Sequence, residues 1–406
     1  MTFFKRLAKG KITIPYFPIG GLLLLFLLLT FISLINSLMF ERVAFNWAMN
    51  DFRIMLYYTL FFSTAWGIKD RRQLKTLLAG VFILANLVVG LMIVQQFLGI
   101  DNLLTSGMSR WQITEEVDGS LRILPPLIFM IAVLASISSA FAFFAEEPRV
   151  KFLSAFQALF LVVGLLLTFT RSAWLTIIMA VLIVIAFAAN EKREKVVGSM
   201  IFVTPALLIV LSLSLVQSSQ RADIPYVGSI FNRVTSIFQT DETVQSDSLQ
   251  WRVFENSEAM KSIQNRPIFG VGLGNQYREI TIAHGEAAGS RTGNDITRLT
   301  RYVHNSILSM AVKMGLPTLI LFLSTYLLFI YKSWKLYPKT DSSIKKSVVI
   351  GVIAIFIPSI FWAQFFTLFT ESNHIMSVAL FMGVISVISD LTESRSQTNS
   401  AVGELN

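Results

Sequence analysis

Residues 303–331 read VHNSILSMAVKMGLPTLILFLSTYLLFIY, and this stretch decides the fold class. After its polar start the stretch is apolar over more than the roughly 20 residues that a helix needs to cross a bilayer. A long polar segment, 217–302, precedes it, so His304 and Asn305 stand where an aqueous loop meets a membrane helix. Polar side chains at such a boundary are the first candidates for chemistry in an otherwise apolar chain.

Similar apolar runs recur along the whole chain. Hydrophobic residues make up 54% of it and charged residues only 15%, whereas an average soluble domain has about 25% charged residues. The runs do not alternate as the strands of a membrane barrel do. We therefore predict an all-α polytopic membrane protein with about ten transmembrane helices. The predicted spans are 19–38, 51–68, 76–98, 123–144, 152–169, 173–189, 197–216, 306–331, 347–369 and 374–390.

Lysine and arginine are unevenly distributed between the two sides of this arrangement. With the N-terminus inside, the inner segments carry 19 of them, and the short outer segments carry only Arg42, Arg110, Arg122 and Arg171. By the positive-inside rule, both termini are cytoplasmic and the long loop is extracytoplasmic. The basic residues of 5–11 before the first span predict an uncleaved signal anchor. The net charge of +9 then reflects orientation in the lipid bilayer, not nucleic-acid binding.

The predicted organisation has four parts. Residues 1–216 form an N-terminal bundle of about seven helices, 217–302 the loop, 303–392 the C-terminal helices and 393–406 a cytoplasmic tail. Within the loop, 248–266 has the pattern of an amphipathic helix, which Pro267 ends. The following run PIFGVGLGN predicts a tight turn whose glycines let the backbone approach a partner closely.

Two residues stand out as candidates for catalysis. Of the three histidines, His284, His304 and His374, the second is the best placed, and its imidazole can accept a proton near neutral pH. The alternative is a histidine that only caps the helix. Arg171 stands between two apolar runs with almost no loop, where an arginine is costly and predicts a function. The alternative is a hairpin arginine that reaches the membrane interface.

Several kinds of chemistry lack their sequence motifs. The chain has no cysteine, so it has no disulfide and no thiol nucleophile. It has no His-Glu-x-x-His motif and no P-loop, and the glycine spacing does not fit a dinucleotide fingerprint. The loop carries eight arginines and one lysine against nine acidic residues, so it is neutral overall. Arginine in such a setting suits a few placed phosphate contacts. We expect chemistry without a metal or a cofactor.

Three stretches together resemble the O-antigen ligase and polymerase superfamily of integral-membrane glycosyltransferases. They are TRSAWL at 170–175, Arg252 with the block RPIFGVGLGN at 266–275, and His304-Asn305 followed by Gly315-Leu316-Pro317. Two features depart from the family pattern. Gly-Leu-Pro-Thr stands where the family often has Gly-x-x-Gly, and no Pro-Asn pair follows Arg122.

The resemblance implies a GT-C-like architecture in the bacterial cytoplasmic membrane, with an extracytoplasmic active site. It implies inverting transfer of a glycan from a polyprenyl diphosphate to a sugar hydroxyl of a glycan or lipid A-core acceptor. His304 would activate that hydroxyl, while Arg171 and Arg252 stabilise the leaving diphosphate. The implied substrate-binding residues are Arg122, Arg266, Asn305, Trp174, Gly272 and Asn275.

Several functions share this pattern. A ligase joins a finished glycan to another acceptor, a polymerase extends the lipid-linked chain, and a third variant transfers the glycan to protein. A flippase for lipid-linked glycans is a different class, and transporters usually bind substrate near the midplane at broken helices. Here the polar candidates cluster at the predicted outer end, which favours an enzyme, with a ligase first and a polymerase second.

Overall fold

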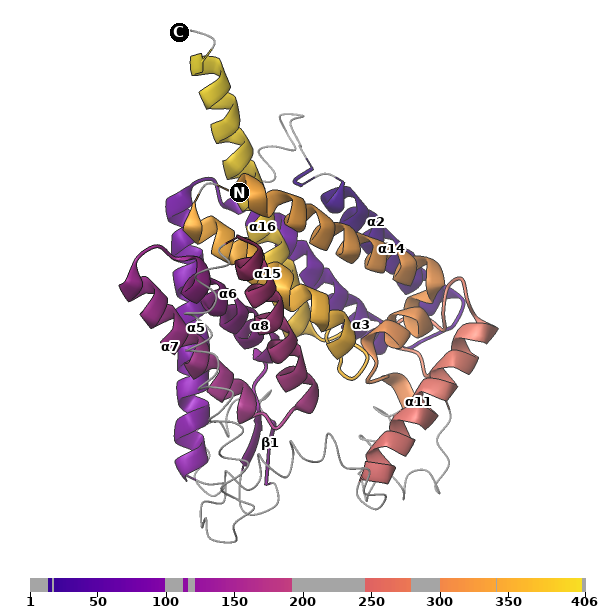
Figure 1. The fold of residues 1–406 in the computed structure, drawn as a ribbon. Coiled ribbons are helices and arrows are strands. Elements are labelled where there is room, and N and C mark those ends of the chain that lie inside the picture. The colour runs from indigo at the N-terminus through magenta and orange to yellow at the C-terminus, as the bar shows by residue number, and fades with distance from the viewer. Residues whose placement is uncertain are drawn as a thin grey trace, which may run out of the picture. The chain divides into compact units, whose positions relative to one another are not determined.

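The computed structural model describes residues 14–16, 18–98, 112–115, 121–191, 245–278, 300–340 and 342–403 (Figure 1). These residues are almost wholly helical, apart from one two-stranded hairpin. The chain falls into two compact units. The first comprises Met1–Lys69, Asp241–Lys332 and Ile360–Asn406, and the second comprises Asp70–Thr240 and Ser333–Ser359.

Seven of the described helices are long and apolar enough to cross a membrane, as judged by length and composition. This finding confirms the predicted class of an all-α membrane protein, whereas the count of ten spans stays a prediction. The seven segments are α2 (Ile19–Met39), α5 (Arg71–Leu98), α7 (Pro148–Leu166), α8 (Arg171–Glu191), α14 with the turn after it (Ser306–Lys339), α15 (Ser343–Trp362) and Ser372–Ser394 of α16 (Ser372–Gly403).

Three other predicted spans have a different outcome. The span 51–68 is a broken segment that consists of α3 (Phe45–Leu56), the 3-10 turn η1 (Tyr57–Thr59) and α4 (Leu60–Gly67). The span 123–144 begins as strand β2 (Leu121–Leu124), which pairs antiparallel with β1 (Gln112–Glu115), and only then becomes the shorter helix α6 (Ile128–Phe144). The span 197–216 lies outside the described residues.

In the second unit, α6 packs against α5, α7 and α8. Every residue from Ile128 to Ala140 is buried, which explains why α6 is apolar all round, without a polar face. Ser136 of α6 donates a hydrogen bond of 2.8 Å to the carbonyl oxygen of Gly351 in α15. A β-carbon on Gly351 would lie 2.5 Å from the Cα of Ile137, so only glycine permits this close contact.

In the first unit, α2 packs against α3, and α16 packs against α4. Buried rings form the core between these elements and α14, where Phe322 lies 5.3 Å from Phe26, 5.5 Å from Tyr58 and 5.1 Å from Phe369 between ring centroids. The predicted amphipathic helix is α11 (Gln245–Asn265), which ends two residues before Pro267. The prediction of a helix in this part of the loop is therefore confirmed.

Helix α14 (Ser306–Leu336) is interrupted at Gly315, which has a φ of 83° and stands two residues before Pro317. The break leaves backbone groups without partners in the helix, and the segment before α14 supplies them. The N–H groups of Val271 and Gly272 donate to the carbonyls of residues 312 and 313 at 2.7 and 3.2 Å, and the N–H of Leu316 donates to Pro267 at 2.8 Å. A membrane helix tolerates such a break where protein satisfies the freed groups.

Candidate active site

His304 lies between the buried Val303 and the first turn of α14, and its side chain is 51% exposed. Its Nδ1 atom lies 3.0 Å from Oε2 and 3.2 Å from Oε1 of Glu255. The backbone N–H of His304 donates to Oε2 of the same carboxylate at 3.2 Å. Because a carboxylate only accepts, Nδ1 carries the proton and Nε2 of the neutral ring is left as a proton acceptor.

Glu255 is 1% exposed on α11. Its other neighbour is Arg278, whose Nη2 lies 3.5 Å from Oε1 and whose side chain is completely buried. The guanidinium of Arg278 lies over the rings of Trp251, Tyr277 and Phe254, with 4.8, 5.1 and 5.4 Å to their centroids. Opposite charge and cation–π contacts of this kind compensate a buried carboxylate.

Arg252 stands one turn before Glu255 on the same helix. Its guanidinium lies 5.9 Å from the ring centroid of Phe365. Partial burial lowers the pKa of Arg252, and the charge of Glu255 raises it; an arginine so placed is still protonated at neutral pH. The structure thus brings two predicted catalytic residues, Arg252 and His304, to one carboxylate.

Glu255 was missed from the sequence, although a signal for it exists. Residues 251, 255, 259 and 263 lie on one face of a helix, and Ala259 and Ile263 are buried there with Glu255. A single acidic residue within an apolar stripe predicts a buried partner.

The glycine turn approaches the protein's own helices. Gly270, Gly272 and Gly274 have φ values of 67°, 95° and 72°, in the left-handed region that glycine adopts most readily. A β-carbon on them would lie 2.4 Å from the Val312 oxygen of α14, 2.6 Å from the Ser37 hydroxyl of α2 and 2.4 Å from the backbone of α3, respectively. The close approach that the sequence predicts is therefore made with α2, α3 and α14.

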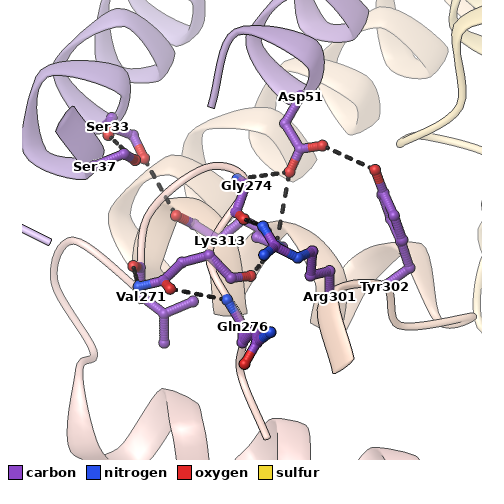
Figure 2. A network of polar contacts seen from close by, with 10 residues as sticks. Ser33, Ser37, Asp51, Val271, Gly274, Gln276, Arg301, Tyr302 and Lys313 are labelled. Atoms are coloured by element: carbon purple, nitrogen blue, oxygen red, sulfur yellow. Dashed lines mark hydrogen bonds and ion pairs between the residues drawn. The ribbon is translucent and has the colours of Figure 1, made fainter. Parts of the chain in front are cut away.

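A buried ion pair holds this turn. Asp51 and Lys313 are 7% and 5% exposed, and the Lys313 ammonium lies 3.6 Å from Oδ2 of Asp51. The same oxygen accepts the N–H of Gly274 at 2.8 Å, and Lys313 donates to the carbonyl of Asn275 at 2.6 Å. Figure 2 shows these groups converging on the turn. Lys313 therefore pairs with Asp51 and the turn.

The same network reaches the segment that carries His304. The hydroxyl of Tyr302 donates to Oδ1 of Asp51 at 3.3 Å, and Arg301 donates to the carbonyl of Gly274 (Figure 2). The Arg301 guanidinium also lies 4.1 Å from the ring centroid of Trp47. These contacts fix the two residues that precede Val303 and His304.

Three predicted substrate-binding residues of the first unit make structural contacts. Asn305 caps α14, since its Oδ1 accepts the N–H groups of residues 307 and 308 at 3.0 and 3.1 Å. Asn275 donates from its side chain to the carbonyl of Val271 at 2.8 Å. Arg266, 47% exposed, forms an ion pair with Glu41. Their role in binding substrate, like that of Gly272, stays a prediction.

In the second unit, Arg171 begins α8 directly after a tight corner. Phe169 at this corner has a φ of 48°. Trp174, which is 3% exposed, donates from its indole N–H to the carbonyl of Leu165 at 3.0 Å. The same carbonyl at the end of α7 also accepts from the N–H and the hydroxyl of Thr168, so the described contact of Trp174 is structural.

Arg122 of β2 lies against the same corner. Its Nε donates to the carbonyl of Thr168 at 3.4 Å, and the N–H of Ile123 donates to Leu167 at 3.2 Å. The hairpin strand therefore brings Arg122 to the corner that presents Arg171. The second unit groups these two predicted cations, as the first unit groups Arg252 with His304.

His374 is 2% exposed in α16, with its ring 5.1 Å from that of Phe366, whereas His284 lies outside the described residues. Among the residues that the structure describes, no cluster of three or more His, Cys, Asp or Glu side chains is able to hold a metal ion.

Comparison with known proteins finds a family model that matches part of this chain. Residues 156–323 match the family model described as O-antigen ligase. This match over part of the chain confirms the resemblance to the O-antigen ligase and polymerase superfamily that the sequence shows. The matched range contains Arg171, Arg252 and His304 but not Arg122. No curated protein sequence matched the chain significantly.

Proposed function

We propose that this protein is a metal-independent inverting glycosyltransferase of the O-antigen ligase type. It moves a glycan from a polyprenyl-diphosphate carrier to an acceptor sugar hydroxyl at the outer face of the cytoplasmic membrane. One observation carries the proposal. Within the family match, a half-exposed histidine has its Nδ1 occupied by a buried carboxylate, which leaves Nε2 available as a base.

The reaction needs one proton acceptor and several cations. Nε2 of His304 takes the proton of the acceptor hydroxyl while its oxygen attacks the anomeric carbon from the face opposite the diphosphate. The bond from that carbon to the diphosphate oxygen breaks, and the leaving group keeps the electron pair. Arg252 and Arg171 stabilise the negative charge that grows there, and Arg122 is a further phosphate ligand. His304 then returns its proton to water.

The alternatives remain a polymerase, which shares the chemistry, and a flippase. A polymerase differs only in its acceptor, and the family match covers both. The broken helix α14 is the feature that would favour a transporter. Its freed backbone groups, however, bond to the segment 267–272, so they are not offered to a substrate. This observation supports an enzyme over a flippase.

A gene deletion in the native host tests the proposal and separates the two enzymes. Loss of a ligase leaves long glycan on its lipid carrier, whereas loss of a polymerase leaves single repeat units on the acceptor. We expect the wild-type gene and the surface variant Lys261→Ala to restore the glycan, and His304→Ala and Arg171→Ala to reach the membrane without restoring it. Restoration by either of the last two removes that residue from the mechanism.

A further inference from the structure

We infer that Glu255 is a positioning residue for the transfer reaction, which it serves by fixing the ring of His304 and stabilising it in its protonated form. This inference rests on the proposed function, in which His304 is the general base. It adds a residue that the sequence pattern of the family did not single out.

Glu255 makes two contacts with His304. One is the contact of its carboxylate with Nδ1 at 3.0 Å, and the other is the bond at 3.2 Å from the backbone N–H of His304. The first contact fixes the tautomer and the rotation of the ring, and the second fixes the backbone from which the ring projects. A base must lie within about 2.6–3.2 Å of the proton that it abstracts, so a ring free to rotate about its side-chain bonds loses rate.

The charge of Glu255 also serves the reaction itself. When His304 accepts a proton it becomes an imidazolium, and a carboxylate at hydrogen-bond distance stabilises that cation. The same division of labour operates between the carboxylate and the histidine of serine proteases. A neutral amide in the same place preserves much of the shape and removes this stabilisation.

The surroundings keep the carboxylate of Glu255 in place. Arg252 on α11 and Arg278 after the glycine turn carry the compensating positive charge. Burial, and then the charge of Glu255, raises the pKa of Tyr277, so this phenol stays neutral. Glu258 also faces Tyr277, from the next turn of α11. Phe365, in the segment after α15, places an uncharged ring beside Arg252.

Glu258 is a matched control on the same helix. It forms an ion pair of 2.7 Å with Lys261, and its side chain is 24% exposed, against 1% for Glu255. Glu258→Gln therefore removes the same charge from the same helix without touching His304. Glu255→Asp keeps the charge and shortens the reach by one methylene group.

The test measures transfer rates of purified protein in lipid nanodiscs between pH 5 and pH 9. The donor is the lipid-linked glycan extracted from the deletion strain, and the acceptor is the membrane lipid fraction of that strain. We expect Glu255→Gln to lower kcat by about 10- to 100-fold, the range for carboxylates that orient a histidine at metal sites, with little change in KM. The acid limb of the pH–rate profile moves to lower pH in this variant, because the variant no longer stabilises the protonated ring of His304.

The remaining variants complete the test. Glu258→Gln keeps the wild-type rate within about twofold, a surface-charge effect of a few tenths of a kcal/mol. Glu255→Asp keeps the wild-type acid limb with an intermediate rate, and this variant decides the matter if Glu255→Gln does not fold. In a background of His304→Ala, Glu255→Gln causes no further loss, since two residues that act as one unit are not additive.

Two failures are distinguishable. If His304→Ala is inactive while folded Glu255→Gln keeps the wild-type rate and acid limb, the role of Glu255 is wrong and the proposed function stands. Equal losses in Glu255→Asp and Glu255→Gln, without a shift of the acid limb, also overturn it. If His304→Ala retains full transfer, the proposed base is wrong.

Discussion

Burying the carboxylate of Glu255 costs several kcal/mol unless nearby groups compensate it. Arg278, itself fully buried at 3.5 Å, and the aromatic rings around it provide that compensation. Such a buried ion pair rarely stabilises the fold more than apolar residues of similar volume do. The charge of Glu255 is therefore better explained by function than by stability. At the residue scale, therefore, the contact with His304 best explains why a glutamate occupies position 255.

The arginines of the first unit are expected to differ in their effect on transfer. Arg252→Ala removes a half-buried cation beside Glu255, and we expect kcat to fall by about 10²- to 10³-fold, as for other lost transition-state contacts. Arg252→Lys recovers part of the rate, because lysine keeps the charge but lacks the planar fork. The measurement is single-turnover transfer by purified protein.

Arg266→Ala is the comparison for this series. Arg266 is 47% exposed, and its hydrogen bond with Glu41 raises its pKa, so it is protonated and paired throughout the working range. A surface ion pair contributes little energy, so Arg266→Ala is expected to lower the rate only through its predicted contact with substrate, and by less than Arg252→Ala does. An equal loss in both alanine variants contradicts the division of roles.

The sequence identified single residues as candidates where a polar side chain stands beside an apolar run, because such a placement costs free energy. Arg171 stands between two apolar runs, and His304 stands at a helix mouth, and both can be recognised without knowledge of the fold. Glu255 and His304 are 49 positions apart, and Asp51 and Gly274 are 223 apart. Their pairing is a product of tertiary packing, which local periodicity does not contain.

At the scale of elements, α14 and the glycine turn form one structure. The break at Gly315 frees the carbonyls of Val312 and Lys313, and the turn is shaped to bond with them. The ion pair of Lys313 with Asp51 then ties both to α3. The glycine turn and the break in α14, which lie far apart in the sequence, thus pack together as one structural unit.

Glycine at position 270 is expected to be essential for the packing of the turn on α14. Gly270→Ala places a β-carbon 2.4 Å from the Val312 oxygen at a φ of 67°. A left-handed conformation alone costs an alanine about 1–2 kcal/mol, and the clash adds to it. We expect the thermal unfolding midpoint of the purified protein in detergent to fall by several degrees.

Gly67→Ala is the control for this substitution. Gly67 ends α4, and a β-carbon added to it would meet no other atom within 4 Å. Alanine also favours helix over glycine by about 1 kcal/mol, so the midpoint of this variant stays equal to wild type or rises. A normal midpoint in Gly270→Ala means that the turn is not packed against α14.

Hydropathy located most helices but not the ends of all of them. The stretch 51–68 is mostly apolar, yet the chain passes through a 3-10 turn at Tyr57–Thr59, where η1 packs against α16. At 121–127, Pro125 and Pro126 prevent a helix from starting earlier, and the residues before them pair as a strand. Apolar composition does not distinguish these states over a few residues.

At the scale of the whole molecule, the side chains of the proposed reaction are found in both units. The first unit holds His304, Glu255 and Arg252, and the second holds Arg171 and Arg122. The O-antigen ligase match spans parts of both.

The most direct test of this account is transfer by purified protein in liposomes. The donor is the lipid-linked glycan from the deletion strain, EDTA is present and nucleotide is absent. We predict that wild type forms a product of higher mass and that folded His304→Ala forms less than about 1% of it, since general bases contribute about 10²- to 10⁴-fold. The account is contradicted if His304→Ala matches wild type, or if wild type moves labelled donor across the bilayer without forming product.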